Sequence, residues 1–349
     1  MTVWEALSKR RQDSQALFVG EESGMERELA QRAGLPFRSV RSGAMHGVSL
    51  LRAAHSLMRV AQGTAQALHT ISDFRPHVIL LTGGFVGVPV SLAGWLRRVP
   101  SVVYLPDVEP GMALRLMARL ATRVAATVDA STFHLRHCNV VTTGYPLRAS
   151  FKSATRAAGR ARFGLSEASL MVLVYGGSKG ARSINQAVLR DLPNLTRHAT
   201  VVHITGAADW EEVRARREAL PEAVRARYQV FPFLHDEMPL AMAAADLVVC
   251  RAGASVLGEL TFFGLPAVLI PYPHAWRYQR VNARYLASRG AAVLLEDHAL
   301  SAAGALARVV NELLGSPARL DAMREASAQL AVHDGAERIA ALLEEVARA

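Results

Sequence analysis

The stretch that decides the fold runs from Val172 to Gln186 and reads VLVYGGSKGARSINQ. An apolar strand ends there at Gly176 and Gly177, and Ser178 leads into a helical pattern. A turn of this kind lets backbone N–H groups and the N-terminus of a helix face an anion, usually a phosphate. The spacing matches neither the Walker P-loop nor the dinucleotide fingerprint. The stretch therefore predicts a phosphate site in the middle of the chain, with an ordinary strand-to-helix turn as the alternative.

Length and composition indicate a globular protein of two domains. The chain has 349 residues, of which 51% are hydrophobic and 20% are charged, whereas a single domain usually holds about 100–200 residues. Its apolar runs are broken well before the roughly 20 residues that a membrane-spanning helix needs, and the N-terminus lacks a signal-peptide core. Cys138 and Cys250 form neither a zinc motif nor a disulfide framework, which favours a reducing cytoplasm.

The chain is strongly basic, with a net charge of +10 and a pI of about 10.3. Most of the excess lies in residues 1–150. This charge favours an anionic substrate or an anionic membrane surface as the partner. We expect no nucleic-acid partner, because the sequence has no helix-turn-helix, zinc or aromatic RNA-binding signature.

Apolar strand-like runs alternate with helical stretches along the chain, which is typical of parallel α/β sheets. Gly, Pro and positive charge interrupt the alternation at Thr142–Arg160. We therefore predict two Rossmann-like domains facing a cleft, residues 1–148 and 149–333. Residues 334–349 form an amphipathic helix that could pack back on the first domain. The strand-like runs are Ala16–Gly20, His77–Leu81, Ser101–Leu105, Asn139–Thr142, Leu170–Tyr175, Thr200–Thr205, Tyr228–Phe231, Leu247–Cys250 and Ala267–Pro271.

The first domain lacks the start that a doubly wound sheet normally has. Thr2–Arg11 reads as the end of a helix, and Ala16–Gly20 reads as a second strand. The first strand of such a sheet lies near its centre, and a sheet without it leaves backbone groups unpaired. We therefore expect the first strand and its glycine turn to be missing from this sequence, and the native polypeptide to begin upstream of Met1.

A second strand followed by a glycine turn is VVCRAGASVLGE, Val248–Glu259. Gly253 would let a ligand approach the backbone, and the N–H groups of Ala254 and Ser255 could face a diphosphate or a ribose. The Glu259 carboxylate could accept hydrogen bonds from both hydroxyls of a ribose. A solvent-exposed helical glutamate is the alternative.

A third stretch, PYPHAWRYQRVNA at Pro271–Ala283, directly follows a predicted strand. Ligands of α/β sheets bind at the carboxyl ends of the strands. Gln279 and Asn282 are three residues apart on a new helix, so both could hydrogen-bond sugar hydroxyls from one face. His274 could act as a base, and a loop histidine satisfied by the backbone is the alternative.

Taken in order, GGSKGARSINQ, FLHDEMPLAMAAADLVVCRAGASVLGE and PYPHAWRYQRVNA resemble the MurG family. The similarity extends forward through Val19–Val40, Leu80–Gly111 and Gly144–Arg148, and so covers essentially the whole chain. Members of this family are GT-B glycosyltransferases that add GlcNAc to undecaprenyl-pyrophosphoryl-MurNAc-pentapeptide (lipid I), which makes lipid II for peptidoglycan. The resemblance implies an inverting, metal-independent hexosyltransferase that uses UDP-GlcNAc and no cofactor.

The resemblance also implies roles for the matching residues. Arg148 should lie near the nucleotide-sugar, Leu234 should flank the uracil, and Gln279 should bind GlcNAc hydroxyls. Ser178 and the neighbouring Gly176 and Gly177 should meet the UDP diphosphate. The residues expected to hold diphosphate and ribose are Gly253, Ala254, Ser255, Val256, Leu257, Gly258 and Glu259.

The sequence departs from the family where the acceptor should bind. The family's G-G-T-G-G-H loop, whose histidine is its proposed base, has no counterpart here. Tyr104–Asp107 reads YLPD where the family reads H-E-Q-N, so Asp107 falls on the family's asparagine. We expect Asp107 or Glu109 to face the acceptor and to serve as candidate base. A metal site built on these two acids, or a simple turn, is the alternative.

Arg41–Ser72 contains no Asp or Glu, and its apolar residues recur at helical spacing. A basic, amphipathic helix of this kind is typical of proteins that touch an anionic bilayer. A crossover helix with its apolar face on the sheet is the alternative. Because a polyprenyl-pyrophosphate-linked acceptor is a lipid, we expect a peripheral protein at the cytoplasmic face of the bacterial cell membrane.

Two other functions are compatible with the same motifs. Another GT-B glycosyltransferase or an epimerase could act on a UDP-sugar through the same turns. A module that binds UDP-sugar without any catalysis could also keep them. An assay with the acceptor separates these alternatives from lipid II synthesis.

Overall fold

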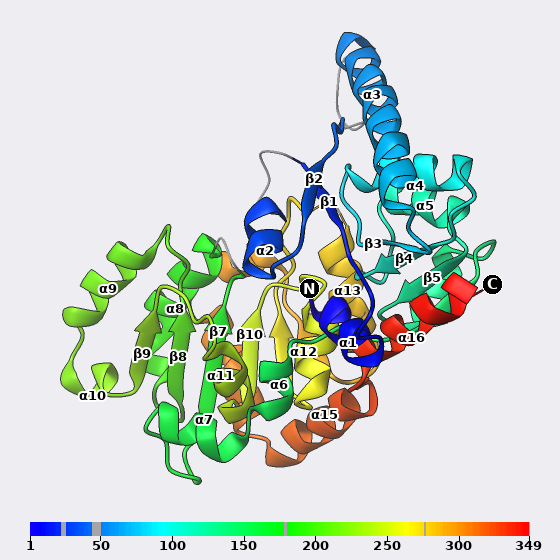
Figure 1. Cartoon of the computed structure of the whole chain (residues 1–349). Helices are drawn as coiled ribbons and strands as arrows, with labels where there is room; N and C mark the ends of the chain where they lie inside the picture. Colours follow the sequence, from blue (N-terminus) through cyan, green and yellow to red (C-terminus); the bar gives the residue numbers. More distant parts are fainter. Residues whose placement is uncertain (22–25, 44–49, 178–179, 276, 349) are drawn as a thin grey trace. The chain divides into compact units, whose positions relative to one another are not determined.

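The computed structural model describes residues 1–21, 26–43, 50–177, 180–275 and 277–348 (Figure 1). Its contacts divide the chain into two compact units. Unit 1 consists of Met1–Pro146 together with Asp334–Ala349, and unit 2 consists of Leu147–His333. The chain thus leaves unit 1 after Pro146 and returns to it with its last helix.

Unit 1 is an α/β unit in which all paired strands are parallel. Its strands form two separate sheets, β1-β2 and β3-β4-β5-β6. The strands are β1 (Phe18–Gly20), β2 (Phe37–Ser39), β3 (Ile79–Leu81), β4 (Ser101–Leu105), β5 (Arg123–Ala126) and β6 (Val140–Thr142). The helices are α1 (Thr2–Arg10), α2 (Glu26–Arg32), α3 (Leu50–Phe74), α4 (Gly87–Leu96), α5 (Met112–Leu120), the 3₁₀ helix η1 (Asp129–His134) and α16 (Gly335–Arg348).

The described strands of unit 1 pair in two separate sheets. Among the described residues, β1 pairs only with β2, in the register Phe18↔Phe37, and β3 pairs only with β4, in the register Ile79↔Ser101. No described strand joins β1 to β3. Each of these two strands therefore has one edge without a ladder of hydrogen bonds.

Helices cover both faces of the four-stranded sheet of unit 1. On one face α1 and α16 pack side by side, joined by an ion pair of 3.1 Å between Arg10 and Glu344. Their apolar side chains, among them Val3 and Ile339, pack with Val102 and Tyr104 of β4. Residues of α3, α4 and α5 form the core on the other face together with Leu81. Part of α3 therefore serves as the crossover helix that the sequence allowed.

Unit 2 contains one six-stranded parallel sheet in the order β12-β11-β10-β7-β8-β9. The strands are β7 (Met171–Tyr175), β8 (Thr200–Ile204), β9 (Tyr228–Phe231), β10 (Leu247–Cys250), β11 (Ala267–Leu269) and β12 (Ala292–Leu294). The helices are α6 (Ala149–Ser153), α7 (Arg156–Arg162), α8 (Arg182–Leu195), α9 (Trp210–Glu218), α10 (Glu222–Arg225), α11 (Met238–Ala244), α12 (Val256–Phe262), α13 (Tyr278–Ser288), η2 (Asp297–Ser301), α14 (Ala305–Leu314) and α15 (Pro317–Gln329).

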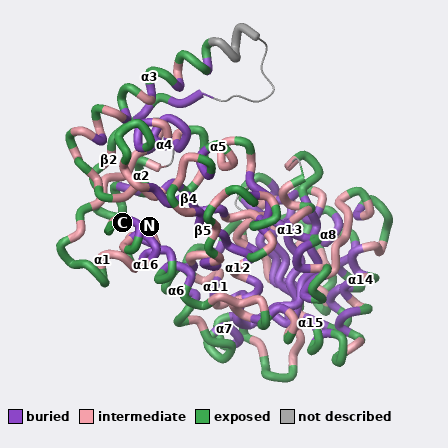
Figure 2. The backbone as a smooth tube through the Cα atoms, turned by 90° about the vertical axis from the view of Figure 1, so that its right-hand side faces the viewer, coloured by how far each residue is buried: buried purple, intermediate pink, exposed green. Residues whose placement is uncertain are grey.

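The core of unit 2 explains why its strands read as continuous apolar runs. All five residues of β7 and all four of β10 are buried, as expected for strands covered on both faces. Side chains of α8 and α14 pack on one face of the sheet around Val172 and Val249, and Figure 2 shows buried strands beneath helices with exposed outer sides. The strand order reverses between the parallel neighbours β7 and β10, since β8 and β9 lie on one side of β7 and β10, β11 and β12 lie on the other, and such sheets bind ligands at this point.

None of the helices in the described ranges is both long enough and apolar enough to span a bilayer. Within the same ranges, no three His, Cys, Asp or Glu side chains come together in a way that could hold a metal ion.

Candidate functional site

The glycine turn after β7 brings the N-terminus of α8 to the end of the central strand of unit 2. A Cβ on Gly176 would lie 2.4 Å from the backbone N of Ala181, and one on Gly180 would lie 2.4 Å from the carbonyl oxygen of Thr205. Gly180 also has a φ of +76°. Only glycine fits this tight path, and it aims the helix at the strand end. Ser178, the residue predicted to meet the diphosphate, lies outside the described residues.

The first turn of α8 is suited to an anion. The helix is preceded by Ala181, and no described side chain caps it. The first N–H groups of a helix have no partner within the helix, and the helix dipole is positive at this end. Gly177 keeps its backbone open, because no atom lies within 4 Å of where its Cβ would be. The start of α8 and the backbone at Gly177 are therefore open to a ligand, and the phosphate contact stays a prediction.

The turn after β10 lies beside it, because β10 and β7 are neighbours with Cys250 opposite Tyr175. The space at Gly253 is open, with no atom within 4 Å of the position that a Cβ would take. The N–H groups of Val256, Leu257, Gly258 and Glu259 donate to carbonyls of the same turn, at 2.8–3.2 Å. The backbone between Gly253 and Ser255 is thus the part of this turn best placed to meet a ligand.

Glu259 lies on α12 behind that turn. Ser255 Oγ donates to its Oε2 at 3.0 Å. Burial raises the pKa of the Glu259 carboxyl group, while the Ser255 hydrogen bond and the positive charge of Arg148 act to lower it. Two predicted residues, Arg148 and Glu259, therefore lie close enough for the charge of Arg148 to act on the Glu259 carboxyl group.

Gln279 and Asn282, the two predicted sugar contacts, both lie on α13 but have different surroundings. The Oε1 atom of Gln279 accepts the backbone N–H of Tyr272 at 2.9 Å, which leaves its amide NH₂ group for a ligand. Asn282 is fully buried, and its Nδ2 donates to the carbonyl of Ala252 at 3.1 Å. Asn282 therefore supports the turn after β10 from below, rather than sharing an open face with Gln279 as its spacing suggests. His274 is exposed, and Trp276 lies outside the described residues.

The loop after β9 contributes apolar surface. Leu234, predicted to flank the uracil, is only 5% exposed, whereas the neighbouring Phe233 is 42% exposed. The ring of Phe233 lies 4.5 Å from that of His235. Phe233 is not among the residues predicted from the sequence, although an aromatic side chain at the carboxyl end of a parallel strand is a signal that could have identified it.

The two acidic candidates of unit 1 differ in their surroundings. Glu109 is 2% exposed, and its Oε1 lies 3.0 Å from the Arg115 guanidinium, which also donates to the carbonyl of Pro110. A buried carboxylate held by an arginine is poorly suited to take a proton from a substrate, so this geometry argues against Glu109 as the base. Asp107 is half-buried at the carboxyl end of β4.

A glycine turn in unit 1 is a further feature that is not among the predicted sites. Gly83 and Gly84, with φ of +105° and +75°, follow β3 and lead to α4. No described side chain caps α4 either. The dipeptide GG after an apolar strand is the available signal, and it lies within the stretch Leu80–Gly111 that carries the family resemblance.

Comparison with known proteins matches both halves of the chain. The glycosyltransferase family 28 N-terminal domain matches residues 2–126, and the C-terminal domain of that family matches residues 171–339. The UDP-N-acetylglucosamine–N-acetylmuramyl-(pentapeptide) pyrophosphoryl-undecaprenol N-acetylglucosamine transferase of Roseiflexus sp. is 42% identical, over 94% of this chain and 83% of its own length. The chain belongs to the MurG family of glycosyltransferases.

Further relatives support the same assignment. The enzyme of the same name from Desulforudis audaxviator is 35% identical over 99% of this chain and 94% of its own length. The crystal structure of MurG from Acinetobacter baumannii has a TM-score of 0.75 with this chain at 22% identity, and the match covers 99% of this chain and 95% of that one. The fold is therefore GT-B, with two α/β domains built on parallel sheets, as predicted.

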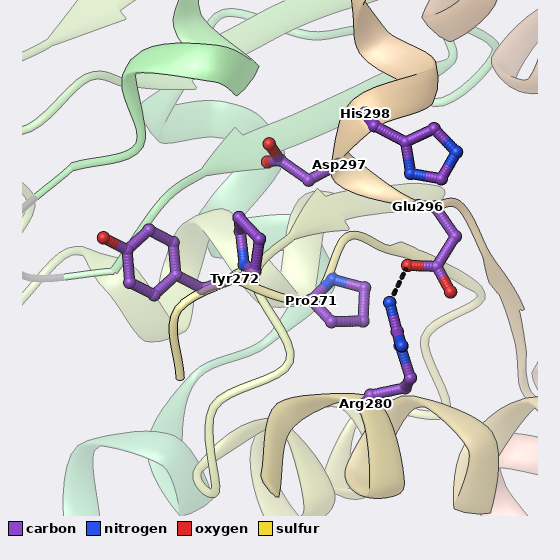
Figure 3. Close-up of a pocket in the computed structure, with 7 residues that line it drawn as sticks. Pro271, Tyr272, Arg280, Glu296, Asp297 and His298 are labelled. Carbon is purple, nitrogen blue, oxygen red and sulfur yellow. Dashed lines mark hydrogen bonds and ion pairs between the residues drawn. The ribbon is translucent and has the colours of Figure 1, made fainter. Parts of the chain in front are cut away.

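A cavity of about 190 Å³ lies in unit 2 beside the loop after β11 (Figure 3). Glu296 and Arg280 form an ion pair of 2.7 Å on one side of it. Asp297, the next residue along the chain, instead accepts hydrogen bonds from Arg251 and Ser183. The cavity is lined by Pro271, Tyr272, Pro273, Arg280, Glu296, Asp297 and His298.

Proposed function

We propose that this chain transfers N-acetylglucosamine from UDP-N-acetylglucosamine to the lipid-linked acceptor for which its relatives are named, N-acetylmuramyl-(pentapeptide) pyrophosphoryl-undecaprenol. The observation that carries the proposal is the pair of turns after β7 and β10. They lie next to each other where the strand order of the sheet reverses. One turn presents the N-terminus of a helix, and the other presents a carboxylate.

The donor is assigned to unit 2 part by part. The diphosphate binds at the turn Gly176–Gly180 and the first turn of α8, and the ribose hydroxyls donate to Glu259. The uracil lies against Phe233 and Leu234, since an exposed ring offers a stacking face to a base. The free amide group of Gln279 donates to the sugar. Arg148 adds a positive charge beside the diphosphate.

The transfer is an inverting displacement. An acceptor hydroxyl attacks the anomeric carbon, a base takes its proton, and the bond between that carbon and the diphosphate oxygen breaks. The negative charge that develops on the departing UDP is stabilised by the N–H groups at the start of α8, because they are already oriented toward it. Asp107 is the proposed base, since it is the less buried of the two acidic candidates.

The acceptor places this chemistry at the cytoplasmic face of the bacterial cell membrane, with the protein bound peripherally. Large apolar side chains of unit 1 support this assignment: Leu57 and Met58 on α3 are 61% and 53% exposed, and Trp95 and Leu96 on α4 are 57% and 55% exposed. Arg97 and Arg98 follow Leu96 directly. Apolar side chains next to arginines suit the interface of an anionic bilayer.

Vesicle cosedimentation tests the membrane contact. The protein should prefer anionic to neutral vesicles, and salt should weaken binding by screening. Replacing Trp95 and Leu96 by Ser should reduce binding, whereas Phe133→Ser, which changes a 71% exposed aromatic on η1, should not. Binding that ignores lipid charge, salt and these substitutions would contradict the assignment.

The transfer itself is tested with lipid I in detergent or vesicles and labelled UDP-N-acetylglucosamine. The expected products are lipid II and UDP in equal amounts. An epimerase would convert the UDP-sugar without any acceptor, and a non-catalytic module would bind it without turnover. Either of these results would contradict the proposal.

A further inference from the structure

A buried arginine lies directly behind the proposed donor site. Arg251 follows β10, and its side chain is 10% exposed. Its Nη2 donates to Ser183 Oγ at 2.8 Å, and its Nη1 donates to the Asp297 carboxylate. Ser183 Oγ in turn donates to the same oxygen, Asp297 Oδ1, at 2.7 Å. The three side chains therefore form a closed triangle of hydrogen bonds.

The triangle joins elements that are far apart in the sequence. Ser183 is in the first turn of α8, and Asp297 begins η2 after β12. Arg251 Nη1 also donates to the carbonyl oxygens of Ile270 and Pro271, at 3.2 and 3.4 Å, and so reaches the loop after β11. The guanidinium carbon lies 5.3 Å from the centre of the Tyr272 ring, at cation–π distance.

These contacts leave Arg251 unsuited to direct ligand binding. Both of its terminal nitrogens donate to protein acceptors, and the Asp297 carboxylate balances its charge. A charge-assisted network of this kind instead restricts the positions of the groups that it joins. The joined groups are the first turn of α8 and the loop whose Tyr272 is held by Gln279.

We infer that Ser183 and Asp297, acting through Arg251, are positioning residues for the sugar-nucleotide. They hold the start of α8, which faces the proposed diphosphate, at a set distance from the loop after β11, whose Tyr272 N–H holds the proposed sugar contact Gln279. This inference rests on the proposed donor site. Of the two carboxylates that line the cavity in Figure 3, Asp297 belongs to this network, whereas Glu296 pairs with Arg280 instead.

Calorimetric titration with UDP and with UDP-N-acetylglucosamine tests the inference. Ser183→Ala and Asp297→Asn should each weaken the binding of both ligands by about three- to tenfold, which is about the net contribution of one hydrogen bond. In the double variant the second change should cost less than alone, because both act through Arg251. Glu296→Gln, which changes the neighbouring carboxylate on the same cavity, should leave both affinities within about twofold.

Arg251→Lys separates positioning from mere destabilisation. Lysine keeps the positive charge but lacks the planar fork of donors. The hydrogen bonds to the Ile270 and Pro271 carbonyls should therefore be lost, and the binding of UDP-N-acetylglucosamine should weaken more than the binding of UDP. Partial unfolding would instead weaken the binding of both ligands by the same factor. If this variant does not fold, Ser183→Ala decides, because a melting temperature equal to that of the wild type separates a weaker affinity from partial unfolding. Wild-type affinities in Ser183→Ala and Asp297→Asn would overturn the inference, whereas failure of the wild type to bind UDP would overturn the proposed function.

Discussion

Removing the Glu259 carboxylate should weaken the binding of UDP-N-acetylglucosamine. Ser255 Oγ, 3.0 Å from Oε2, holds the carboxylate in place, and Arg148 supplies a positive charge nearby. Two ribose hydroxyls donating to a carboxylate form charge-assisted hydrogen bonds. We expect Glu259→Ala to cost about 1–3 kcal/mol, roughly 5- to 150-fold in Kd. Glu259→Gln keeps one carbonyl acceptor, so its affinity should lie between those of the wild type and Glu259→Ala.

The same carboxylate should make binding depend on pH. Burial raises the pKa of Glu259 in the free protein, so its protonated fraction grows as the pH falls through that raised pKa. Only the ionised form accepts both ribose hydroxyls, and the affinity of the wild type should therefore decrease toward acidic pH. Glu259→Gln has no such group and should show a flatter profile.

Isothermal titration calorimetry between about pH 8 and pH 5 measures both effects. UDP-N-acetylglucosamine is the better ligand, because its diphosphate is esterified at both ends and keeps its charge over this range, whereas the terminal phosphate of UDP titrates. Glu325→Gln on α15 is a matched control that should behave as the wild type. Equal affinities for wild type, Glu259→Gln and Glu259→Ala at every pH would refute the ribose assignment.

Three further outcomes are expected. Burial lowers the pKa of His203 to about 3, so below about pH 6.5 the unfolded chain takes up a proton that the folded chain does not. The free energy of unfolding should therefore fall as the pH drops, by roughly 2 kcal/mol at pH 5. Urea unfolding of His203→Gln should lack this loss. The Tyr175 hydroxyl is buried beside the Cys250 thiol, which is a weak hydrogen-bond partner, so Tyr175→Phe should change the free energy of unfolding in urea by less than about 1 kcal/mol. Asp107→Asn should lower kcat for lipid II formation at least about 100-fold if Asp107 is the base, whereas Glu109→Gln should mainly lower the melting temperature.

Much of the fold follows from the apolar runs, because strands buried on both faces must be apolar throughout. Every run predicted as a strand contains a strand of the structure. Three strands of the described residues were not predicted. β2 reads FRS and is largely exposed, and β5 reads RVAA and consists mainly of small residues, so pairing with neighbours rather than composition makes these two strands. β12 reads AVL, as the predicted β11 does, and its composition does not explain why it was missed.

The candidate site was predictable only where it depends on the ends of strands. The turns after β7, β10 and β11 meet at one edge because parallel strands end together. The orientation of individual side chains was not predictable in this way. The spacing of Gln279 and Asn282 indicates a shared helix face, but tertiary packing turns Asn282 inward to the Ala252 carbonyl. The contact between Arg251 and Asp297 joins residues 46 positions apart and leaves no local pattern.

The donor half of the site explains why the sequence alone left several activities open. The proposed diphosphate contacts are backbone N–H groups at a helix start, and the proposed ribose contact is one carboxylate. An enzyme that binds a UDP-sugar in this way can use the same groups whether it transfers the sugar or epimerises it. The reaction is decided instead by the group that takes a proton from the acceptor hydroxyl. That group belongs to the other half of the reaction, so the comparison of Asp107→Asn with Glu259→Gln separates catalysis from donor binding: the first should lower kcat with little change in donor affinity, and the second should do the reverse.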